Sequence, residues 1–392
     1  MLTIGYLAFC KAHVEIVRSL FDRMNWRGIE IVVTKTNHDS SGKNIAETVL
    51  YLKGQSIPYT VEPRRKYDVL MSCVIQPIAV RKQYGHAGTK LVRIMYSSAG
   101  KNYTYGPDNA VFDLILTVGP YAEKRLSSFA PCVSVGMPRF DDLHSGKLDV
   151  SALKQVANIG QDRPLLLYLP TWGAESSIAR YREQIIGSSK DFIVIVKPHP
   201  LTYMRERHRL DLFKDTKVRL IPEDCSIVEL LAMADLVISD YSGSIFEAMA
   251  ADKPILLLDV DDDTLRGSHL HEEEGPEHRF RDMAPRVCKP TEYEARLAEA
   301  LRDEEPWPTR RRAYADMFFA CRDGTSSEKA ATAIRTFMNR NRYRIVFGRW
   351  WSSFRSRWEI IQKLYEWFRP HSGGGRSVRR CLSRPRKRRF EA

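Results

Sequence analysis

The sequence predicts an α/β protein made of two Rossmann-like, doubly wound domains that face a central cleft, followed by a basic amphipathic C-terminal segment. Short apolar runs alternate with amphipathic helical patterns through residues 1–145, and the alternation begins again after a polar joint near residues 144–149. Continuous apolar strands separated by helices are typical of parallel sheets that are covered on both faces. We therefore expect a first Rossmann-like domain at 1–145, a second with late helices at 146–340, and a tail at 341–392.

The first domain is expected to contain six strands, with a helix at His13–Met24 after the first. Val14, Val17, Leu20 and Phe21 lie on one face of that helix, at the spacing of an amphipathic helix. The N-terminus has no basic flank before its apolar run, so we interpret it as a buried strand and not as a signal peptide. The predicted strands are Thr3–Leu7, Glu30–Val33, Asp68–Val74, Leu91–Met95, Leu114–Val118 and Cys132–Val135.

The second domain repeats this pattern with five predicted strands and with helices at Ile227–Met233 and Ile245–Ala250. From Thr291 to about Arg340 the pattern is helical, and we expect these late helices to return to the first domain. Ligands of open α/β sheets bind beyond the carboxyl ends of the strands, so two such sheets predict a nucleotide site in the cleft. The predicted strands are Pro164–Leu169, Phe192–Val196, Arg219–Ile221, Leu236–Ile238 and Ile255–Leu258.

The charge of the chain is concentrated at one end. From Arg340 to Ala392 there are 16 Lys and Arg residues against three acids, which accounts for the whole net charge of +13. Residues 1–339 carry 45 charges of each sign, so the body is neutral and nucleic acid is disfavoured as its partner. The seven cysteines are scattered and never spaced as Cys-x-x-Cys, which argues against a disulfide framework or a structural zinc site.

The most informative stretch follows the apolar run that ends at Ser239. Asp240-Tyr-Ser-Gly-Ser244 forms a small polar turn before a helix, where backbone N–H groups lack intrahelical partners and favour a phosphate. Ser242, Gly243 and Ser244 are therefore candidate phosphate ligands, and Glu247 is placed to reach a ribose hydroxyl. An ordinary serine cap with a glutamate one turn later explains the same pattern.

Two further segments carry candidate residues. Lys197-Pro-His199-Pro follows a buried strand directly, so Lys197 and His199 are presented at its carboxyl end, where they could bind a diphosphate or stabilise its developing charge. Glycines flank His86 in Gly85-His-Ala-Gly-Thr-Lys90, which predicts a turn that exposes the ring. An imidazole titrates near neutral pH and could take a proton from an attacking hydroxyl. A solvated polar turn is the alternative for both segments.

These segments and two others resemble, in the same order, motifs of the CDP-glycerol glycerophosphotransferase family. Gly136-Met-Pro-Arg139-Phe-Asp141 is similar to its Gly-x-Pro-Arg-x-Asp, and Tyr168-Leu-Pro-Thr171-Trp172 to its Tyr-x-Pro-Thr-aromatic motif. Lys197–Pro200 resembles its Lys-x-His-Pro motif, and Ser239–Ser242 with Glu247 its Ser-Asp-Tyr-Ser-Ser run with a later acid. The family's Trp-His-Gly-Thr-Pro corresponds less closely to residues 85–89, where Ala87 is inserted and the tryptophan is absent.

The resemblance implies a GT-B-type fold, a donor held mainly by the second domain, and no metal or other cofactor. It implies that Ser242, Gly243 and His199 contact the diphosphate and that Glu247 contacts the ribose, with Thr171, Lys197 and Ser244 lining the same site. His86 would be the base that prepares an acceptor hydroxyl for attack on the distal phosphorus, releasing CMP. The remaining motif residues expected at the site are Gly88, Thr89, Arg139 and Asp240. Gly243 stands where the family commonly has a second serine.

The resemblance implies transfer of glycerol phosphate, or a related alditol phosphate, from a CDP-activated donor to a hydroxyl of a polyol- or sugar-containing, lipid-linked acceptor. A GT-B-type glycosyltransferase or nucleotide-sugar epimerase that uses a UDP- or CMP-sugar is the enzymatic alternative, because a fold alone does not fix function. The second alternative is a catalytically vestigial protein that binds membrane or nucleic acid. The segment His269–Glu274, with Asp261–Asp263 before it, is interpreted as a solvated acidic loop rather than a metal site.

The tail predicts a peripheral location on the inner face of the cell membrane. Aromatic and aliphatic residues recur every three or four positions from Arg344 to Arg369, with arginines between them, and a polybasic run follows at Arg384–Arg389. Basic amphipathic helices rich in Trp and Phe bind anionic bilayer interfaces, so we expect Arg344–Arg389 to dock on a membrane surface. Packing on the body and nucleic-acid binding are the alternatives.

Overall fold

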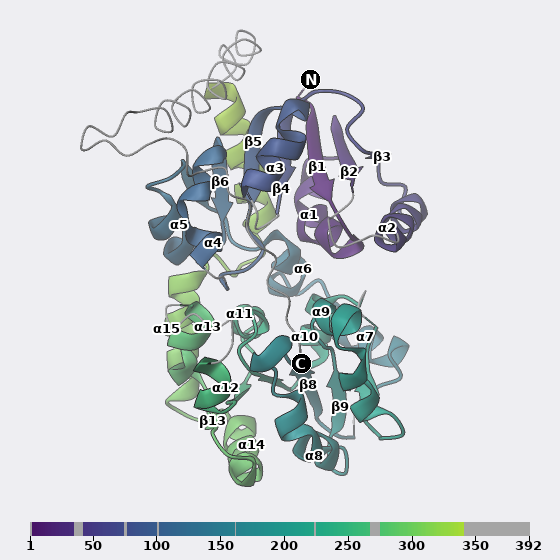
Figure 1. The fold of residues 1–392 in the computed structure, drawn as a ribbon, viewed down its shortest axis with the longest axis vertical. Helices are drawn as coiled ribbons and strands as arrows, with labels where there is room; N and C mark the ends of the chain where they lie inside the picture. The colour runs from purple at the N-terminus through teal and green to yellow at the C-terminus, as the bar shows by residue number, and fades with distance from the viewer. Residues whose placement is uncertain are drawn as a thin grey trace, which may run out of the picture. The chain divides into compact units, whose positions relative to one another are not determined.

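The computed structural model describes residues 2–34, 42–73, 77–99, 102–160, 162–222, 225–266 and 275–340. The predicted amphipathic tail and the acidic residues 267–274 lie outside these ranges, so the structure tests neither prediction. The described residues contain two parallel β-sheets connected by helices (Figure 1, purple to blue for the first sheet and teal to green for the second). The predicted α/β class is confirmed.

The first sheet has seven strands in the order β3-β2-β1-β4-β5-β6-β7, and every recorded pair is parallel. The order reverses between β1 and β4, which is the point where doubly wound sheets open a crevice at their carboxyl edge. Helix α1 (Lys11–Arg23) follows β1 and buries the apolar face that the sequence predicts. The strands are β1 (Ile4–Ala8), β2 (Ile29–Val33), β3 (Tyr59–Val61), β4 (Tyr67–Ser72), β5 (Gly88–Ile94), β6 (Leu114–Thr117) and β7 (Cys132–Ser134).

The second sheet repeats this topology with six strands in the order β10-β9-β8-β11-β12-β13. Its order reverses between β8 and β11, so a second crevice is expected at the carboxyl edge there. All five residues of β8 are buried, as befits a central strand covered by helices on both faces. The strands are β8 (Leu165–Leu169), β9 (Ile193–Val196), β10 (Arg219–Leu220), β11 (Leu236–Ser239), β12 (Ile255–Leu258) and β13 (Arg286–Val287).

The helices of the second sheet follow its strands closely. Helix α8 (Ile178–Ser188) and helix α10 (Ile227–Met233) pack apolar faces on the sheet, and α11 (Ser244–Ala250) leaves the turn after β11. The further helices are α9 (Pro200–Arg205), α12 (Asp262–Arg266), α13 (Pro276–Arg279), α14 (Tyr293–Arg302) and α15 (Trp307–Phe318). The first sheet carries α2 (Lys43–Gly54), α3 (Pro77–Tyr84), α4 (Asn102–Tyr105), α5 (Pro120–Leu126) and α6 (Asp141–His144), and α7 (Val150–Val156) precedes β8.

The chain returns to the first sheet after α15, as the helical pattern predicts. The backbone N–H of Ala320 donates to the carbonyl of Val118 (2.9 Å), and a Cβ on Gly119 would lie 2.2 Å from the carbonyl oxygen of Phe318. Asp141 then accepts from the backbone N–H groups of Ser326 (3.0 Å) and Ser327 (2.7 Å), where a helix over residues 326–340 begins. These contacts attach the late helices to the segments that leave β6 and β7.

Three differences separate the predicted strands from the observed ones. The edge strands β3 and β13 were not predicted because they have only three and two residues and no apolar run. Strand β5 begins at Gly88, three residues before the predicted start, because Gly88 fits against Leu70 of β4, whose Cβ would lie 2.5 Å from a Cβ at position 88. Gly88 and Thr89, which were predicted to lie in a site loop, are therefore the first residues of β5.

Candidate functional site

The candidate site on the second sheet lies at the carboxyl ends of β8 and β11, where the strand order reverses. The loop that contains Thr171 and Trp172 follows β8, and the turn Asp240-Tyr-Ser-Gly243 follows β11. Because these two strands flank the reversal of strand order, their loops diverge and leave room for a ligand at the carboxyl edge. Sequence analysis placed Thr171, Ser242, Gly243 and Asp240 in one site, and the structure brings them together here.

Asp240 joins the two loops. Its buried carboxylate accepts from the backbone N–H of Thr171 (2.8 Å) and from the backbone N–H (2.9 Å) and hydroxyl (2.7 Å) of Ser177. Burial raises the pKa of Asp240 to about 6, although these hydrogen bonds act in the opposite direction. Asp240 therefore organises the crevice and has its oxygens directed at protein groups.

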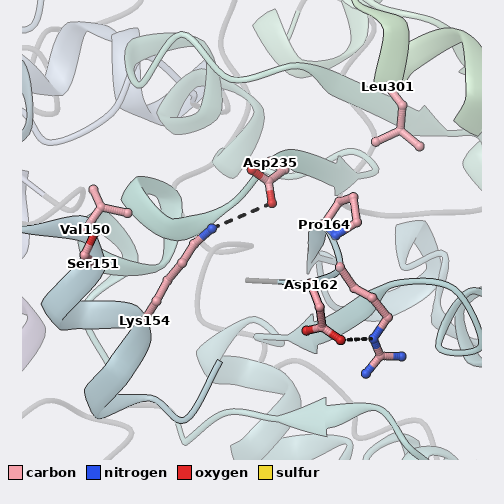
Figure 2. Close-up of a pocket in the computed structure, with 8 residues that line it drawn as sticks. Val150, Ser151, Lys154, Asp162, Pro164, Asp235 and Leu301 are labelled. Atoms are coloured by element: carbon pink, nitrogen blue, oxygen red, sulfur yellow. Dashed lines mark ion pairs between the residues drawn. The ribbon is translucent and has the colours of Figure 1, made fainter. Parts of the chain in front are cut away.

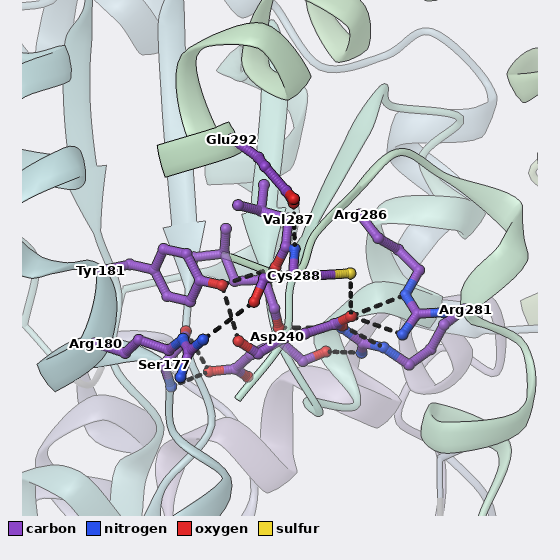
Figure 3. A network of polar contacts seen from close by, with 11 residues as sticks. Ser177, Arg180, Tyr181, Asp240, Arg281, Arg286, Val287, Cys288 and Glu292 are labelled. Carbon is purple, nitrogen blue, oxygen red and sulfur yellow. Dashed lines mark hydrogen bonds and ion pairs between the residues drawn. The ribbon is translucent and has the colours of Figure 1, made fainter. Parts of the chain in front are cut away.

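A buried arginine supports the same turn from the other side (Figure 3). Arg281 donates to the carbonyl of Asp240 (2.7 Å), to the carbonyl of Leu258 (3.1 Å) and to the carboxylate of Asp259 (2.6 Å), which also accepts from Arg286 (2.6 Å). Burial alone would raise the pKa of Asp259, but the two guanidinium groups hold it below its usual value. The guanidinium of Arg281 also lies 4.0 Å from the centre of the Tyr241 ring. This network was not predicted, because its members are spread over some 40 residues of sequence.

The serines of the turn divide their roles. Ser244 is the first residue of α11, and its hydroxyl bonds to the carbonyl of Leu169 (3.2 Å) and to the hydroxyls of Ser239 (3.0 Å) and Ser242 (2.9 Å). The structure therefore uses Ser244 to join the ends of β8 and β11, which leaves Ser242 and Gly243 as the members of the turn that suit a ligand. The sequence alone did not distinguish these serines.

His199 and Lys197 lie at the carboxyl end of β9, next to β8. The Nδ1 atom of His199 accepts from the backbone N–H of Leu201 (3.1 Å), so in the neutral ring the proton is on Nε2, which is a hydrogen-bond donor. The rings of His199 and Trp172 have their centres 6.3 Å apart. The Lys197 ammonium reaches the carbonyl of Pro222 at 3.4 Å. This arrangement favours anion binding by His199 over proton abstraction.

Glu247 and Arg139 form an ion pair, although they lie 108 residues apart in the sequence. Arg139 belongs to the short segment that leaves the first sheet, and it also donates to the carbonyl of Tyr96 (3.1 Å), just after β5. Both side chains of the pair are 14% exposed. The structure thus connects the expected ribose-binding carboxylate directly to the carboxyl edge of the first sheet.

The loop at Tyr96–Ala99 is the part of the first sheet that meets the donor turn. A Cβ on Gly243 would lie 2.9 Å from the Cβ of Ala99 and 3.6 Å from the hydroxyl of Ser97. Burial, with Cys73 as a second cause, raises the pKa of Tyr96, so its phenol stays protonated. This close approach explains why glycine stands at position 243. The loop was not predicted as part of the site, although the small polar residues after the predicted strand Leu91–Met95 were a signal for a turn there.

His86, Gly88 and Thr89 are not brought to this site. His86 lies in a 3-10 turn (Gly85–Ala87) before β5, and Gly88 pairs in register with Tyr67, the first residue of β4. The segment therefore lies at the amino edge of the first sheet. Strands rise about 3.3 Å per residue, so the seven residues of β5 separate it from the carboxyl edge by about 20 Å. The expectation that His86 shares a site with the donor turn is corrected by this topology.

A pocket of about 680 Å³ lies at the amino edge of the second sheet (Figure 2). Pro164 and Asp235 line it just before β8 and β11 begin, and Lys154 lies 3.9 Å from the carboxylate of Asp235. Because ligands of doubly wound sheets bind at the opposite edge, this pocket is separate from the candidate site. Among the described residues, no three His, Cys, Asp or Glu side chains are grouped as a metal site would require.

Comparison with known proteins identifies the family. Residues 121–336 match the family model described as CDP-glycerol:poly(glycerophosphate) glycerophosphotransferase, and the match covers more than half of the chain. The chain belongs to this family of transferases. The matched range contains Thr171, His199 and the turn at 240–247, whereas His86 and the Tyr96–Ala99 loop precede it.

Two relatives are named as enzymes of teichoic-acid synthesis. The chain is 27% identical over 221 residues to the teichoic acid poly(glycerol phosphate) polymerase of Bacillus subtilis, covering 52% of this chain and 28% of that protein. It is 22% identical over 307 residues to the teichoic acid ribitol-phosphate primase of Bacillus spizizenii, covering 74% and 75%. The aligned part of the chain thus spans less than a third of the length of the polymerase.

Solved structures agree on the fold. The wall teichoic acid polymerase TagF superposes with a TM-score of 0.59 at 14% identity, over 86% of this chain and 89% of that one. The UDP-N-acetylglucosamine 2-epimerase from Rickettsia bellii superposes with a TM-score of 0.53 at 12% identity, over 88% of this chain and all of that one. The predicted arrangement of two Rossmann-like domains of GT-B type is confirmed at the level of the fold.

Proposed function

We propose that the protein transfers glycerol phosphate, or a related alditol phosphate, from a CDP-activated donor to a hydroxyl of a cell-surface polymer or its lipid-linked precursor. The observation that carries the proposal is the crevice between β8 and β11, where Thr171, Ser242 and Gly243 converge within a chain of the glycerophosphotransferase family. In the proposed step the acceptor oxygen bonds to the distal phosphorus, the bond from that phosphorus to the bridging oxygen breaks, CMP leaves, and the proton of the acceptor hydroxyl is released to solvent.

The donor would lie across the carboxyl edge of the second sheet. Backbone N–H groups of the 242–243 turn and the Nε2–H of His199 would donate to the diphosphate oxygens, with Lys197 supplying positive charge nearby. Glu247 would accept from the ribose hydroxyls. Phosphoryl transfer requires mainly positioning and stabilisation of the developing charge, and the anchored turn supports both. Asp240 contributes by fixing the turn.

The acceptor would approach from the first sheet. The Tyr96–Ala99 loop supports this assignment because it contacts the donor turn at Gly243. The protonated phenol of Tyr96 is a hydrogen-bond donor, so it can orient an acceptor oxygen but does not serve as a base. His86 has no part in this scheme, because it lies at the other edge of the sheet.

A nucleotide screen tests the proposal. The purified chain should be stabilised against thermal unfolding by CMP and CDP, and by CDP-glycerol or CDP-ribitol, more than by UMP, UDP, GDP or ADP. A ligand at a hundred times its dissociation constant adds about 2.7 kcal/mol to the free energy of unfolding, which a thermal shift detects readily. Transfer is then measured as CMP release in the presence of a glycerol-phosphate primer. No response to cytidine nucleotides would contradict the proposal.

A glycosyltransferase or epimerase that uses a nucleotide sugar is the second candidate. It is favoured by one observation, the superposition on the Rickettsia epimerase and on the Anabaena protein HepE, which was solved with UDP and glucose. Selective stabilisation by uridine nucleotides in the same screen would establish this alternative in place of the first.

Membrane attachment is proposed for the basic tail, Arg344–Arg389. The described residues contain no helix that is long and apolar enough to cross a membrane. The concentration of the net positive charge in this tail supports attachment to an anionic surface, which would bring the enzyme to a lipid-linked acceptor. Removal of residues 341–392 should abolish co-sedimentation with phosphatidylglycerol vesicles and leave nucleotide binding intact. Unchanged co-sedimentation would contradict the proposal.

A further inference from the structure

Arg139 lies at the junction between the two sheets. It belongs to the short 3-10 turn Pro138–Phe140 that follows β7, and its side chain is 14% exposed. A single nitrogen, Nη2, donates both to the carbonyl of Tyr96 and to the carboxylate of Glu247. One side chain therefore contacts the acceptor-side loop and the carboxylate proposed to bind the ribose.

The arginine is held in place by its surroundings. Its guanidinium carbon lies 5.9 Å from the centre of the Tyr96 ring and 5.5 Å from that of Phe140, so aromatic side chains limit where it can move. The 3-10 turn is itself held by Asp141. Its carboxylate accepts hydrogen bonds from two backbone N–H groups at the start of the last described helix. The position of the guanidinium is thus fixed from both sides before any ligand binds.

The guanidinium of Arg139 is not fully paired within the protein. Its Nε atom is buried and has no hydrogen-bond partner among the residues that the structure describes. Most buried polar atoms in proteins have a partner. The ion pair uses Oε1 of Glu247, so Oε2 is the oxygen that would accept from a ribose hydroxyl. An unpaired glutamate would adopt several rotamers, whereas this one is oriented by its partner.

We propose that Arg139 is a positioning residue that fixes the carboxylate of Glu247 for the donor ribose and ties that contact to the Tyr96 loop. The inference rests on the proposed function, since it assumes that Glu247 binds the donor. It predicts that the effect of Arg139 on donor binding is exerted through Glu247. Loss of the guanidinium should then weaken donor binding without slowing the chemical step, because uniform binding changes KM and not kcat.

A double-mutant cycle tests the inference. The full-length chain is compared with Arg139→Met, Glu247→Gln and the double variant, using calorimetric titration with CDP and steady-state kinetics with CDP-glycerol. Arg139→Met should weaken CDP binding and raise KM about tenfold, the range expected from one charge-assisted hydrogen bond, and change kcat less than about threefold. Because both substitutions break the same contact, the double variant should bind CDP like Glu247→Gln.

The control variant is Arg125→Met. The Arg125 guanidinium lies over the rings of Tyr105 and Tyr121 and donates to the Tyr121 hydroxyl, so its contacts are with these tyrosines and not with Glu247. The control variant should leave CDP affinity unchanged. Unchanged affinity in Arg139→Met, or effects of the two single variants that add in the double variant, would overturn the inference alone. Failure of the wild-type chain to bind any cytidine nucleotide would overturn the proposed function, and this inference with it.

Discussion

The two sheets have the same strand order around their crossover points, but their carboxyl edges are held together by different chemistry. In the second sheet, buried charges connect the loops: Asp240 accepts from the loop after β8, and Arg281 joins that turn to Asp259. In the first sheet, the corresponding acceptors are neutral oxygens: the buried Arg93 donates to the carbonyl of Thr104 (2.9 Å), and the Tyr105 hydroxyl donates to that of Ser98 (2.6 Å).

This difference indicates a division of labour. Hydrogen bonds to charged groups contribute about 1.5–3 kcal/mol each, against about 0.5–1.5 kcal/mol for neutral ones, so we expect the carboxylate and guanidinium contacts to hold the donor-side turn firmly. A firmly held turn suits a diphosphate, whose charges require donors at fixed positions. Four substitutions test this comparison, in order of decreasing expected effect.

Removal of Arg281 should have the largest effect. Arg281→Met leaves Asp259 and the carbonyls of Asp240 and Leu258 without their buried donor, so we expect the free energy of unfolding to fall by about 3–5 kcal/mol. Urea denaturation followed by circular dichroism measures this. Arg286→Met is the matched control: Arg286 binds the same carboxylate, but its side chain is 46% exposed, and we expect a loss of about 1 kcal/mol or less. Equal losses would contradict the assignment of Arg281 as the organising group.

Asp240→Asn should come next, with a loss of about 1–3 kcal/mol at pH 7, because the amide nitrogen would face backbone N–H groups that need an acceptor. The loss should depend on pH. The folded pKa of about 6 exceeds the unfolded value of 3.8, so the carboxyl group favours the folded state most below pH 4 and progressively less as the pH rises to about 6. The difference between wild type and variant should therefore shrink over this range.

The pH dependence of stability should have the opposite sign for Asp259, because the pKa of its carboxyl group is lower in the folded state than in the unfolded state. Its contribution to stability is present above pH 4 and is lost as the pH falls further. Urea titrations at pH 3, 4, 5, 6 and 7 separate the two groups. A wild-type advantage over Asp240→Asn that grew with pH would contradict the buried position of Asp240.

Gly243→Ser should have a smaller effect, confined to the contact between the two edges. A side chain at 243 must displace Ala99 or the turn, and we expect CDP affinity to fall about tenfold, or 1.4 kcal/mol. Because the clash is with the Cβ of Ala99, the double variant Ala99→Gly/Gly243→Ser should recover most of the affinity. Calorimetric titration measures both. Absence of rescue would show that the serine acts through the turn itself.

His86→Ala should have the smallest effect. The residue lies outside the site, at the amino edge of the first sheet, so we expect kcat and CDP affinity to change less than about twofold and stability less than about 0.5 kcal/mol. Tyr96→Phe is the variant to compare with His86→Ala, because it removes one hydroxyl from the loop that contacts the donor turn. A large loss of transfer in His86→Ala with intact nucleotide binding would restore the histidine as base.

Much of the second domain was accessible from sequence, because its signals are local. An apolar run such as Leu165–Leu169 must be buried, and a small polar turn after β11 must lie at a strand end, whatever the rest of the chain does. The motifs that place Thr171, His199, Gly243 and Glu247 are each contained within a few residues. The family itself could be inferred from their order.

The site residues of the first domain were harder to predict from sequence. Their prediction depends on which end of a strand a segment lies at. Glycines beside His86 predict a turn, and turns occur at both edges of a parallel sheet. The start of β5 at Gly88, required by the close packing on Leu70, determines the edge. The predicted strand Leu91–Met95 also follows His86, so the candidate base was misplaced by matching this turn to the family's histidine motif and not by the position of the strand.

The sequence by itself determined the α/β class, the two doubly wound halves, the family and the donor-side motif residues, because each depends on periodicity or on residues adjacent in the chain. Only the tertiary structure decided that Ser244 supports the strands, that Asp240 and Arg281 brace the turn, and that Arg139 pairs with Glu247 beside the Tyr96 loop. These are contacts between residues up to 108 positions apart. Such contacts exist only after the sheets have packed, and local patterns do not encode them.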